Sequence, residues 1–123
     1  MGDRALVIFK HQDNYSPVTY LHWHGSDVPQ LLWNTREWMV GRENDLDYTA
    51  ARFVGVCHRH IDGNCSLGIW NLPSDFKHTE KYLEEMSQGN AGVIIVDVST
   101  WEFEQYGGYE LEPVAPLPSR DFR

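Results

Sequence analysis

The segment from Thr19 to Asp27 constrains the fold most, because it joins a strand pattern to a helix start. Its sequence is TYLHWHGSD. Side chains two residues apart on a strand share a face, so His22 and His24 are predicted to project together from a candidate site. The following glycine ends the strand, and Ser26 or Asp27 marks the start of a helix. The opposite face of the strand is expected to be core and carries Leu21 and Trp23.

Hydrophobic patterning predicts five strands and three helices. Apolar residues recur every three or four positions over 27–40 and 48–61, and over a shorter helix at 79–88. Short apolar or alternating runs predict strands over 5–9, 18–24, 66–72, 93–98 and 101–106. In this order the elements indicate an α+β fold, in which a largely antiparallel sheet of about five strands carries two main helices and one short helix.

The size and composition are those of one globular domain. The chain has 123 residues, of which 41% are hydrophobic, and no apolar run approaches the ~18 residues of a membrane span. We predict a single α+β domain over residues 1–109 and a proline-rich, extended or disordered tail over residues 110–123. The early apolar run is too short for a signal peptide, and a cytoplasmic location is therefore expected.

Acidic residues are concentrated in the C-terminal half. The formal net charge is −8, and residues 75–112 contribute −7 of it. Because such a surface repels nucleic-acid phosphates, no direct nucleic-acid binding is expected. Two interpretations stay open, namely a solvated face that keeps the protein soluble and a patch that meets a basic protein surface. For the second interpretation we single out four residues that are predicted to be exposed: Glu84, Glu85, Glu102 and Glu104.

Histidines and cysteines suggest a metal site only in part. Imidazole and thiolate are ligands that zinc prefers, and the chain has His22, His24, Cys57 and His60 available. On the predicted helix, however, Cys57 lies on the apolar stripe, where a buried reduced thiol is common, and His58 points away from it. We therefore predict no metal and no cofactor, with a site made by those four residues as the alternative.

Motifs of catalysis are missing from the sequence. There is no nucleophile elbow, Walker loop, His-Glu-x-x-His or Gly-x-Gly-x-x-Gly. A histidine that acts as a general base needs a nucleophile, or a water held by a second group. A small metal- or histidine-dependent enzyme, or a nucleotide-sequestering protein that uses the His22 and His24 face, stays open as the alternative. We assign no catalytic residue and expect a binding function.

Tryptophan is abundant, with five in the chain. Trp38 fits the apolar stripe of the helix predicted over 27–40, whereas Trp33 falls outside it. Tryptophan is enriched at the energetic centres of protein interfaces and also stacks on nucleotide rings. We therefore predict that Trp33 contacts a partner.

Several motifs resemble those of small uncharacterised proteins of phages and prophages. They are YLHWHG at 20–25, AARFVG at 50–55, SLG at 66–68, and the strand at 92–98 followed by Trp101 and by GGY at 107–109. The resemblance covers nearly the whole domain and implies a mobile-element accessory protein, in a group where acidic anti-CRISPR and other counter-defence inhibitors are frequent. It supplies no catalytic residue. With the acidic half of the chain, it implies a partner that is a host protein or nucleoprotein complex with a basic surface, in the cytoplasm of an infected or lysogenic cell. Since no apolar run is long enough for a membrane span, no membrane partner is expected. The oligomeric state is left open.

Overall fold

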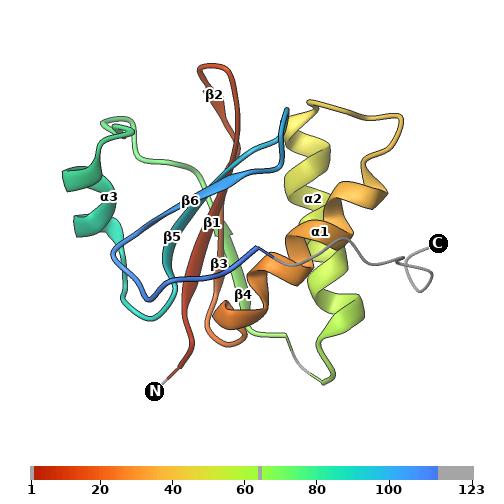
Figure 1. Cartoon of the computed structure of the whole chain (residues 1–123), viewed down its shortest axis with the longest axis horizontal. Coiled ribbons are helices and arrows are strands. Elements are labelled where there is room, and N and C mark those ends of the chain that lie inside the picture. The colour runs from red at the N-terminus through yellow and green to blue at the C-terminus, as the bar shows by residue number, and fades with distance from the viewer. Residues whose placement is uncertain (1, 64, 114–123) are drawn as a thin grey trace.

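The computed structural model describes residues 2–63 and 65–113. Within these residues, six strands and three α-helices form an α+β fold, which confirms the predicted class (Figure 1). In chain order the elements are β1 (Ala5–His11), β2 (Asn14–Tyr15), β3 (Val18–Leu21), the 3-10 turn η1 (Gly25–Asp27), α1 (Val28–Trp38), α2 (Leu46–His60), β4 (Leu67–Trp70), α3 (Glu80–Met86), β5 (Gly92–Asp97) and β6 (Phe103–Tyr106).

The sheet is mixed, although most of its pairs are antiparallel. Its strand order is β4-β3-β1-β5-β6, and the short β2 pairs with the end of β1. β1 and β5 are parallel, and every other pair is antiparallel. A parallel pair needs a long crossover connection, and here α1, α2, β4 and α3 all lie between the two central strands in the sequence.

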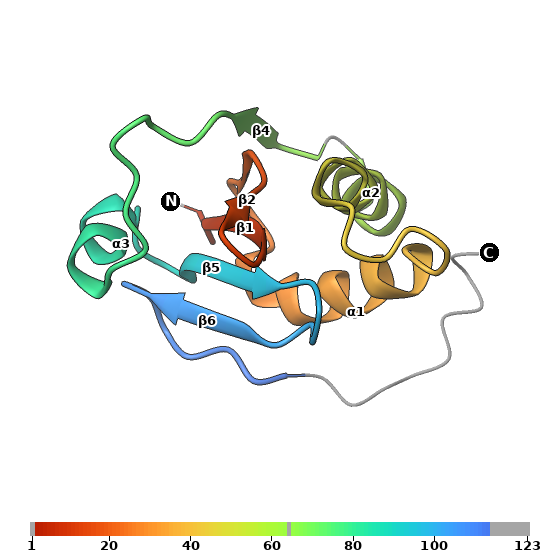
Figure 2. The same cartoon turned by 90° about the horizontal axis from the view of Figure 1, so that it is seen from above.

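Both faces of the sheet are covered. α1 and α2 lie on one side, and α3 lies on the other (Figure 2). Along β1, Val7 and Phe9 pack in the cluster under α1 and α2, while Leu6 and Ile8 pack with Leu83 of α3. Because side chains alternate between the faces of a strand, coverage of both faces leaves residues 5–9 of β1 and 93–96 of β5 apolar and buried. The apolar runs that predicted strands over 5–9 and 93–98 therefore belong to the two parallel strands in the middle of the sheet.

The helix starts follow local capping chemistry. Asp45 caps α2 by accepting a hydrogen bond from the backbone N–H of Tyr48, at 3.2 Å. Thr79 caps α3 by accepting one from the N–H of Tyr82, also at 3.2 Å. A capping side chain satisfies an amide that has no partner within the helix. α2 therefore begins at Leu46, two residues before its predicted start.

The strand predicted over 18–24 is shorter than its alternation suggested. β3 ends at Leu21, and His24 adopts a left-handed backbone conformation with φ 71°. The amide of Gly25 donates to the carbonyl oxygen of Asp3 at 2.7 Å, which bends the chain away from the sheet. The prediction that His22 and His24 project from one face of a strand is therefore wrong. The core assignment of Trp23 is also wrong, since this residue is 49% exposed.

Part of the predicted tail lies within the described residues. Leu111 is buried in the cluster under the two main helices, and its amide donates to Gln105 Oε1 at 2.7 Å. Ordered packing therefore continues at least to Leu111, beyond the predicted domain boundary at 109. The rest of the predicted tail, residues 114–123, lies outside the described residues. None of the helices in the described part has the length and apolar content needed to cross a bilayer.

Candidate functional site

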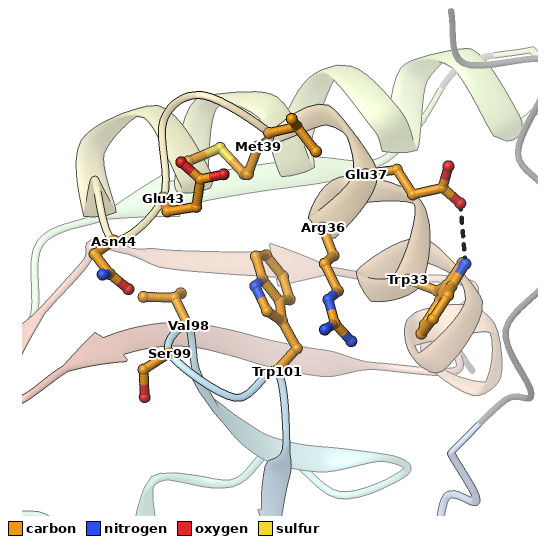
Figure 3. A pocket seen from close by; sticks show the side chains of 10 residues that line it. Trp33, Arg36, Glu37, Met39, Glu43, Asn44, Val98, Ser99 and Trp101 are labelled. Carbon is orange, nitrogen blue, oxygen red and sulfur yellow. Dashed lines mark hydrogen bonds between the residues drawn. The ribbon is translucent and has the colours of Figure 1, made fainter.

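Two tryptophans from distant parts of the chain line the same hollow. It has a volume of about 590 Å³ and lies between α1, the loop that follows α1 and the turn between β5 and β6 (Figure 3). Trp33 and Arg36 come from α1, whereas Trp101 comes from the turn. An adjoining hollow is lined by the same three residues. We call the surface formed by Trp33, Arg36 and Trp101 the aromatic groove.

The α1 side of the groove is held by contacts along the helix. Trp33 Nε1 donates to Glu37 Oε1 at 3.1 Å, and the guanidinium carbon of Arg36 lies 5.3 Å from the centre of the Trp33 ring. Residues three and four apart on a helix are neighbours on its surface. Both contacts therefore follow directly from the helical spacing, and they orient the Trp33 ring. The prediction that Trp33 contacts a partner is not tested by this geometry, but Trp33 does line the groove.

The β5–β6 side of the groove is formed by Trp101 in an unusual backbone conformation. Its φ is 63°, in the left-handed region that a bulky residue rarely adopts. Its amide donates to the carbonyl oxygen of Asp97 at 2.6 Å, and the centres of the Trp101 and Phe9 rings lie 6.1 Å apart in an edge-to-face arrangement. The pattern of alternation had placed Trp101 in the final strand, but β6 begins only at Phe103. A residue held in a strained conformation at the rim of a hollow is a candidate for function.

Asp97 organises this turn through its carboxylate as well as its carbonyl. Asp97 Oδ1 accepts hydrogen bonds from the amide of Ser99 at 2.9 Å and from Ser99 Oγ at 2.6 Å. These bonds favour the charged form, so they lower the pKa of Asp97 below its usual value of 3.8. The carboxylate thereby holds the turn that carries Trp101.

Replacing Asp97 with asparagine is expected to weaken the dependence of stability on acid pH. A carboxyl whose pKa is lowered by folding contributes stability above its ordinary pKa, and this contribution disappears as pH falls through the lowered pKa. The melting temperature of the wild type should therefore fall as pH drops below 3.8, the usual pKa of an aspartate carboxyl. The melting temperature of D97N should fall less over the same pH range. Melting curves followed by tryptophan fluorescence over this pH range measure both. Identical pH profiles for the two proteins would contradict the role of Asp97.

On the other side of β6 lie the four predicted glutamates, which we call the acidic face. All four are exposed, as predicted, with Glu84 and Glu85 on α3 and the other two next to or within β6. Glu104 Oε1 accepts from Tyr106 Oη at 2.9 Å and lies 3.0 Å from His78 Nε2. Burial, together with this hydrogen bond, raises the pKa of Tyr106 to about 12. Tyr106 therefore stays a neutral donor to Glu104 at physiological pH.

The aromatic groove and the acidic face meet at β6. Phe103 lines the hollow next to Trp33 and Trp101, and it also lines a hollow of about 400 Å³ that contains Glu102 and Glu104. Since successive residues of a strand point to opposite sides, Phe103 packs on the side of the groove, whereas Glu104 and Tyr106 lie on the other side of the hairpin. A single partner that binds the β5–β6 hairpin can therefore contact both the aromatic groove and the acidic face.

The predicted histidine site is rearranged in the structure. His22 Nδ1 lies 2.7 Å from Tyr20 Oη, and the His22 ring packs against the edge of Trp23. His24 instead pairs through Nδ1 with Asp27 Oδ2 at 2.9 Å and lines a hollow of about 400 Å³ together with His60. The structure therefore brings His24 to His60, a juxtaposition that the strand pattern could not indicate.

Cys57 does not join either histidine as a reactive group. It is fully buried in the main core, and burial raises the pKa of its thiol, which keeps it protonated. Among the described residues, no group of three or more histidine, cysteine, aspartate or glutamate side chains is placed to hold a metal ion. The alternative ligand set of His22, His24, Cys57 and His60 is therefore not assembled.

The groups of the aromatic groove suit binding better than reaction. Ring faces, a guanidinium and neighbouring carboxylates provide apolar contact, stacking and charged hydrogen bonds. No family model, curated protein or solved structure matches this chain. The function is therefore inferred from the groove, the acidic face and the histidine hollow.

Proposed function

We propose that the protein is a non-catalytic binding protein that docks on a basic protein surface through the β5–β6 hairpin. The observation that carries this proposal is the position of Trp33, Arg36 and Trp101 around one hollow, beside the hairpin segment that carries Glu102 and Glu104. Tryptophan and arginine supply much of the binding energy at interfaces. Complementary charge mainly accelerates encounter and selects the partner. The groove would anchor the partner, and the acidic face would attract it.

The partner class that fits best is a host complex whose basic surface normally holds nucleic acid. A chain of net charge −8 competes for such a surface because its carboxylates replace phosphates as counter-charges. Together with the resemblance of its motifs to phage and prophage proteins, this charge argument supports the proposal of an anti-CRISPR-like or other counter-defence inhibitor. It would act in the cytoplasm of an infected or lysogenic cell.

The histidine hollow supports a second candidate function. A carboxylate on Nδ1 orients an imidazole so that Nε2 can act as a base, and the His24–Asp27 pair has this arrangement. His60 and Asp62 line the same hollow, which offers further polar groups to a small ligand. The second candidate is therefore a histidine-dependent enzyme, or a nucleotide-capturing protein, that uses His24 and His60.

A quantitative pull-down from host extract tests the proposal. The immobilised wild type is expected to retain a nucleic-acid-binding complex. Replacing Trp33 and Arg36 with alanine should weaken binding of the purified complex by roughly 10-fold or more, the scale of losing one or two interface anchors. Alanine preserves α1 because it is the best helix former. The matched control is Trp23→Ala, which removes an exposed tryptophan that precedes η1 and does not line the groove, and which should bind normally.

Histidine variants separate the two candidates. Replacing His22, His24 and His60 with alanine should leave binding of the complex intact if the groove and acidic face carry the function. The proposal would be contradicted if this variant lost binding of the complex with an unchanged melting temperature, while the Trp33 and Arg36 variant bound the complex normally. That result would favour chemistry or ligand capture in the histidine hollow.

A further inference from the structure

The sheet has an open edge far from the β5–β6 hairpin. β4 is the terminal strand (Figure 2), and within the described residues it pairs only with β3. The amide of His22 donates to the carbonyl oxygen of Ser66 at 3.1 Å. Backbone groups alternate in direction along an antiparallel strand, so those of Gly68 and Trp70 also face β3. The N–H and C=O groups of Leu67 and Ile69 therefore point outward, where another strand could pair with them.

This edge lacks most of the usual protection against pairing. Monomeric proteins protect edge strands with short length, charged side chains, proline or a bulge. β4 is short, with four residues, but its sequence LGIW contains no charged residue and no proline. Ile69 is 56% exposed and Trp70 is 41% exposed, and both are among the exposed large hydrophobic residues of the described chain. An exposed apolar edge of this kind is typical of a site that pairs with another strand.

The absence of charge at this edge indicates what can cover it. Residues 14–26 and 63–74 contain no aspartate, glutamate, lysine or arginine, in a chain with 23% charged residues. β3 and β4 lie in these two segments and pair with each other. Two copies of a chain with net charge −8 repel through their acidic parts, so they meet most favourably where neither copy carries charge. A basic partner, in contrast, finds no carboxylate here.

We propose that two copies of the chain pair antiparallel through β4, edge to edge about a two-fold axis. The backbone N–H and C=O of Ile69 point away from β3. Ile69 can therefore form the central hydrogen-bonded pair with Ile69 of the second copy. This register places Trp70 opposite the partner's Gly68, which has no side chain to obstruct the ring. Trp70 is already stacked on Tyr20, with ring centres 5.7 Å apart and an interplanar angle of 29°. Little side-chain freedom is therefore lost on pairing.

The proposed dimer does not depend on the function proposed above. β4 and β6 are opposite edges of the sheet, so pairing at β4 leaves the aromatic groove and the acidic face of each copy open. Two copies would form one continuous sheet with a partner-binding hairpin at each end.

Mass measurement at increasing concentration tests the dimer. In sedimentation equilibrium the wild type should move from 14.3 kDa toward twice this mass, whereas Ile69→Lys should stay at the monomer mass. The matched control is Val40→Lys, which makes the same charge change at a side chain that is 70% exposed and should dimerise like the wild type. Should I69K fail to fold by circular dichroism, Ile69→Thr keeps the β-branched shape and should still weaken the dimer.

Hydrogen exchange at one backbone amide gives an independent readout. The Leu67 N–H should exchange slowly in concentrated wild type and rapidly in dilute wild type or in I69K. A wild type that stays at 14.3 kDa at every concentration, with a rapidly exchanging Leu67 amide, would overturn the proposal. So would a dimer that persists in I69K, or slow exchange of this amide in a protein that remains monomeric.

Discussion

Replacing Phe9 with alanine is expected to lower the free energy of unfolding by about 3–5 kcal/mol, the usual cost of deleting a buried phenylalanine side chain. Phe9 is fully buried on the central strand β1. The centre of its ring lies 5.5 Å from the ring centre of Phe53 in α2 and 6.1 Å from that of Trp101 in the β5–β6 turn, and both contacts are edge-to-face. The substitution therefore leaves a cavity where the sheet, a main helix and the turn of the aromatic groove meet. Since small domains are stable by only about 5–15 kcal/mol, the loss is a large fraction of the total.

Urea and thermal unfolding measure this effect. The melting temperature of Phe9→Ala should fall by on the order of 10–20 °C for a domain of this size. Tryptophan fluorescence should change in the folded state as well, because the Trp101 ring loses a neighbour. Val40→Ala is the control, since Val40 is 70% exposed and its truncation should change stability by no more than about 0.5 kcal/mol. A loss below about 1 kcal/mol in Phe9→Ala would contradict the core placement of Phe9.

Reversing the acidic face should produce the largest change in partner association. With Glu84, Glu85, Glu102 and Glu104 replaced by lysine, the net charge rises from −8 to about zero. Electrostatic steering raises association rates by about 10- to 1000-fold, so we expect association of the purified complex to slow by 10-fold or more at low salt. The difference should shrink as salt is added, because exposed charges are screened. Stopped-flow or biosensor kinetics at several ionic strengths measure both effects.

A pair of smaller variants separates position from total charge. Reversing Glu102 and Glu104 changes the net charge by the same amount as reversing Asp47 and Asp62, which are exposed on or after α2. The first pair should slow association more than the second if the acidic face faces the partner. If the two double variants slowed association equally, Glu102 and Glu104 would contribute only through the overall charge of the protein. The proposed mode of binding would be excluded if the four-lysine variant bound the complex as well as the wild type while the variant lacking His22, His24 and His60 did not bind it.

Much of the secondary structure follows from the sequence by itself. Helical and strand periods predicted α1, α2, α3 and the five main strands, because burial of one face imposes a spacing on the apolar residues. The cap of α2 by Asp45 is also local in sequence, since capping acts over only a few residues. The exposure of the four glutamates was predictable for the same reason. Each lies on the polar side of a locally defined element.

The site itself was decided by tertiary structure. A periodic pattern shows which side of an element is buried, but not which distant element covers it. Trp33 and Trp101 share a groove only because β5 pairs in parallel with β1 and thereby brings the β5–β6 turn to α1. His24 meets His60 because long-range bonds to Asp3 bend the chain after β3 and carry His24 away from the strand that its alternation predicted. Leu111 is buried for a similar reason, since Gln105 on the last strand holds its amide. Such contacts depend on which surfaces fit together, and this information is distributed over the whole chain.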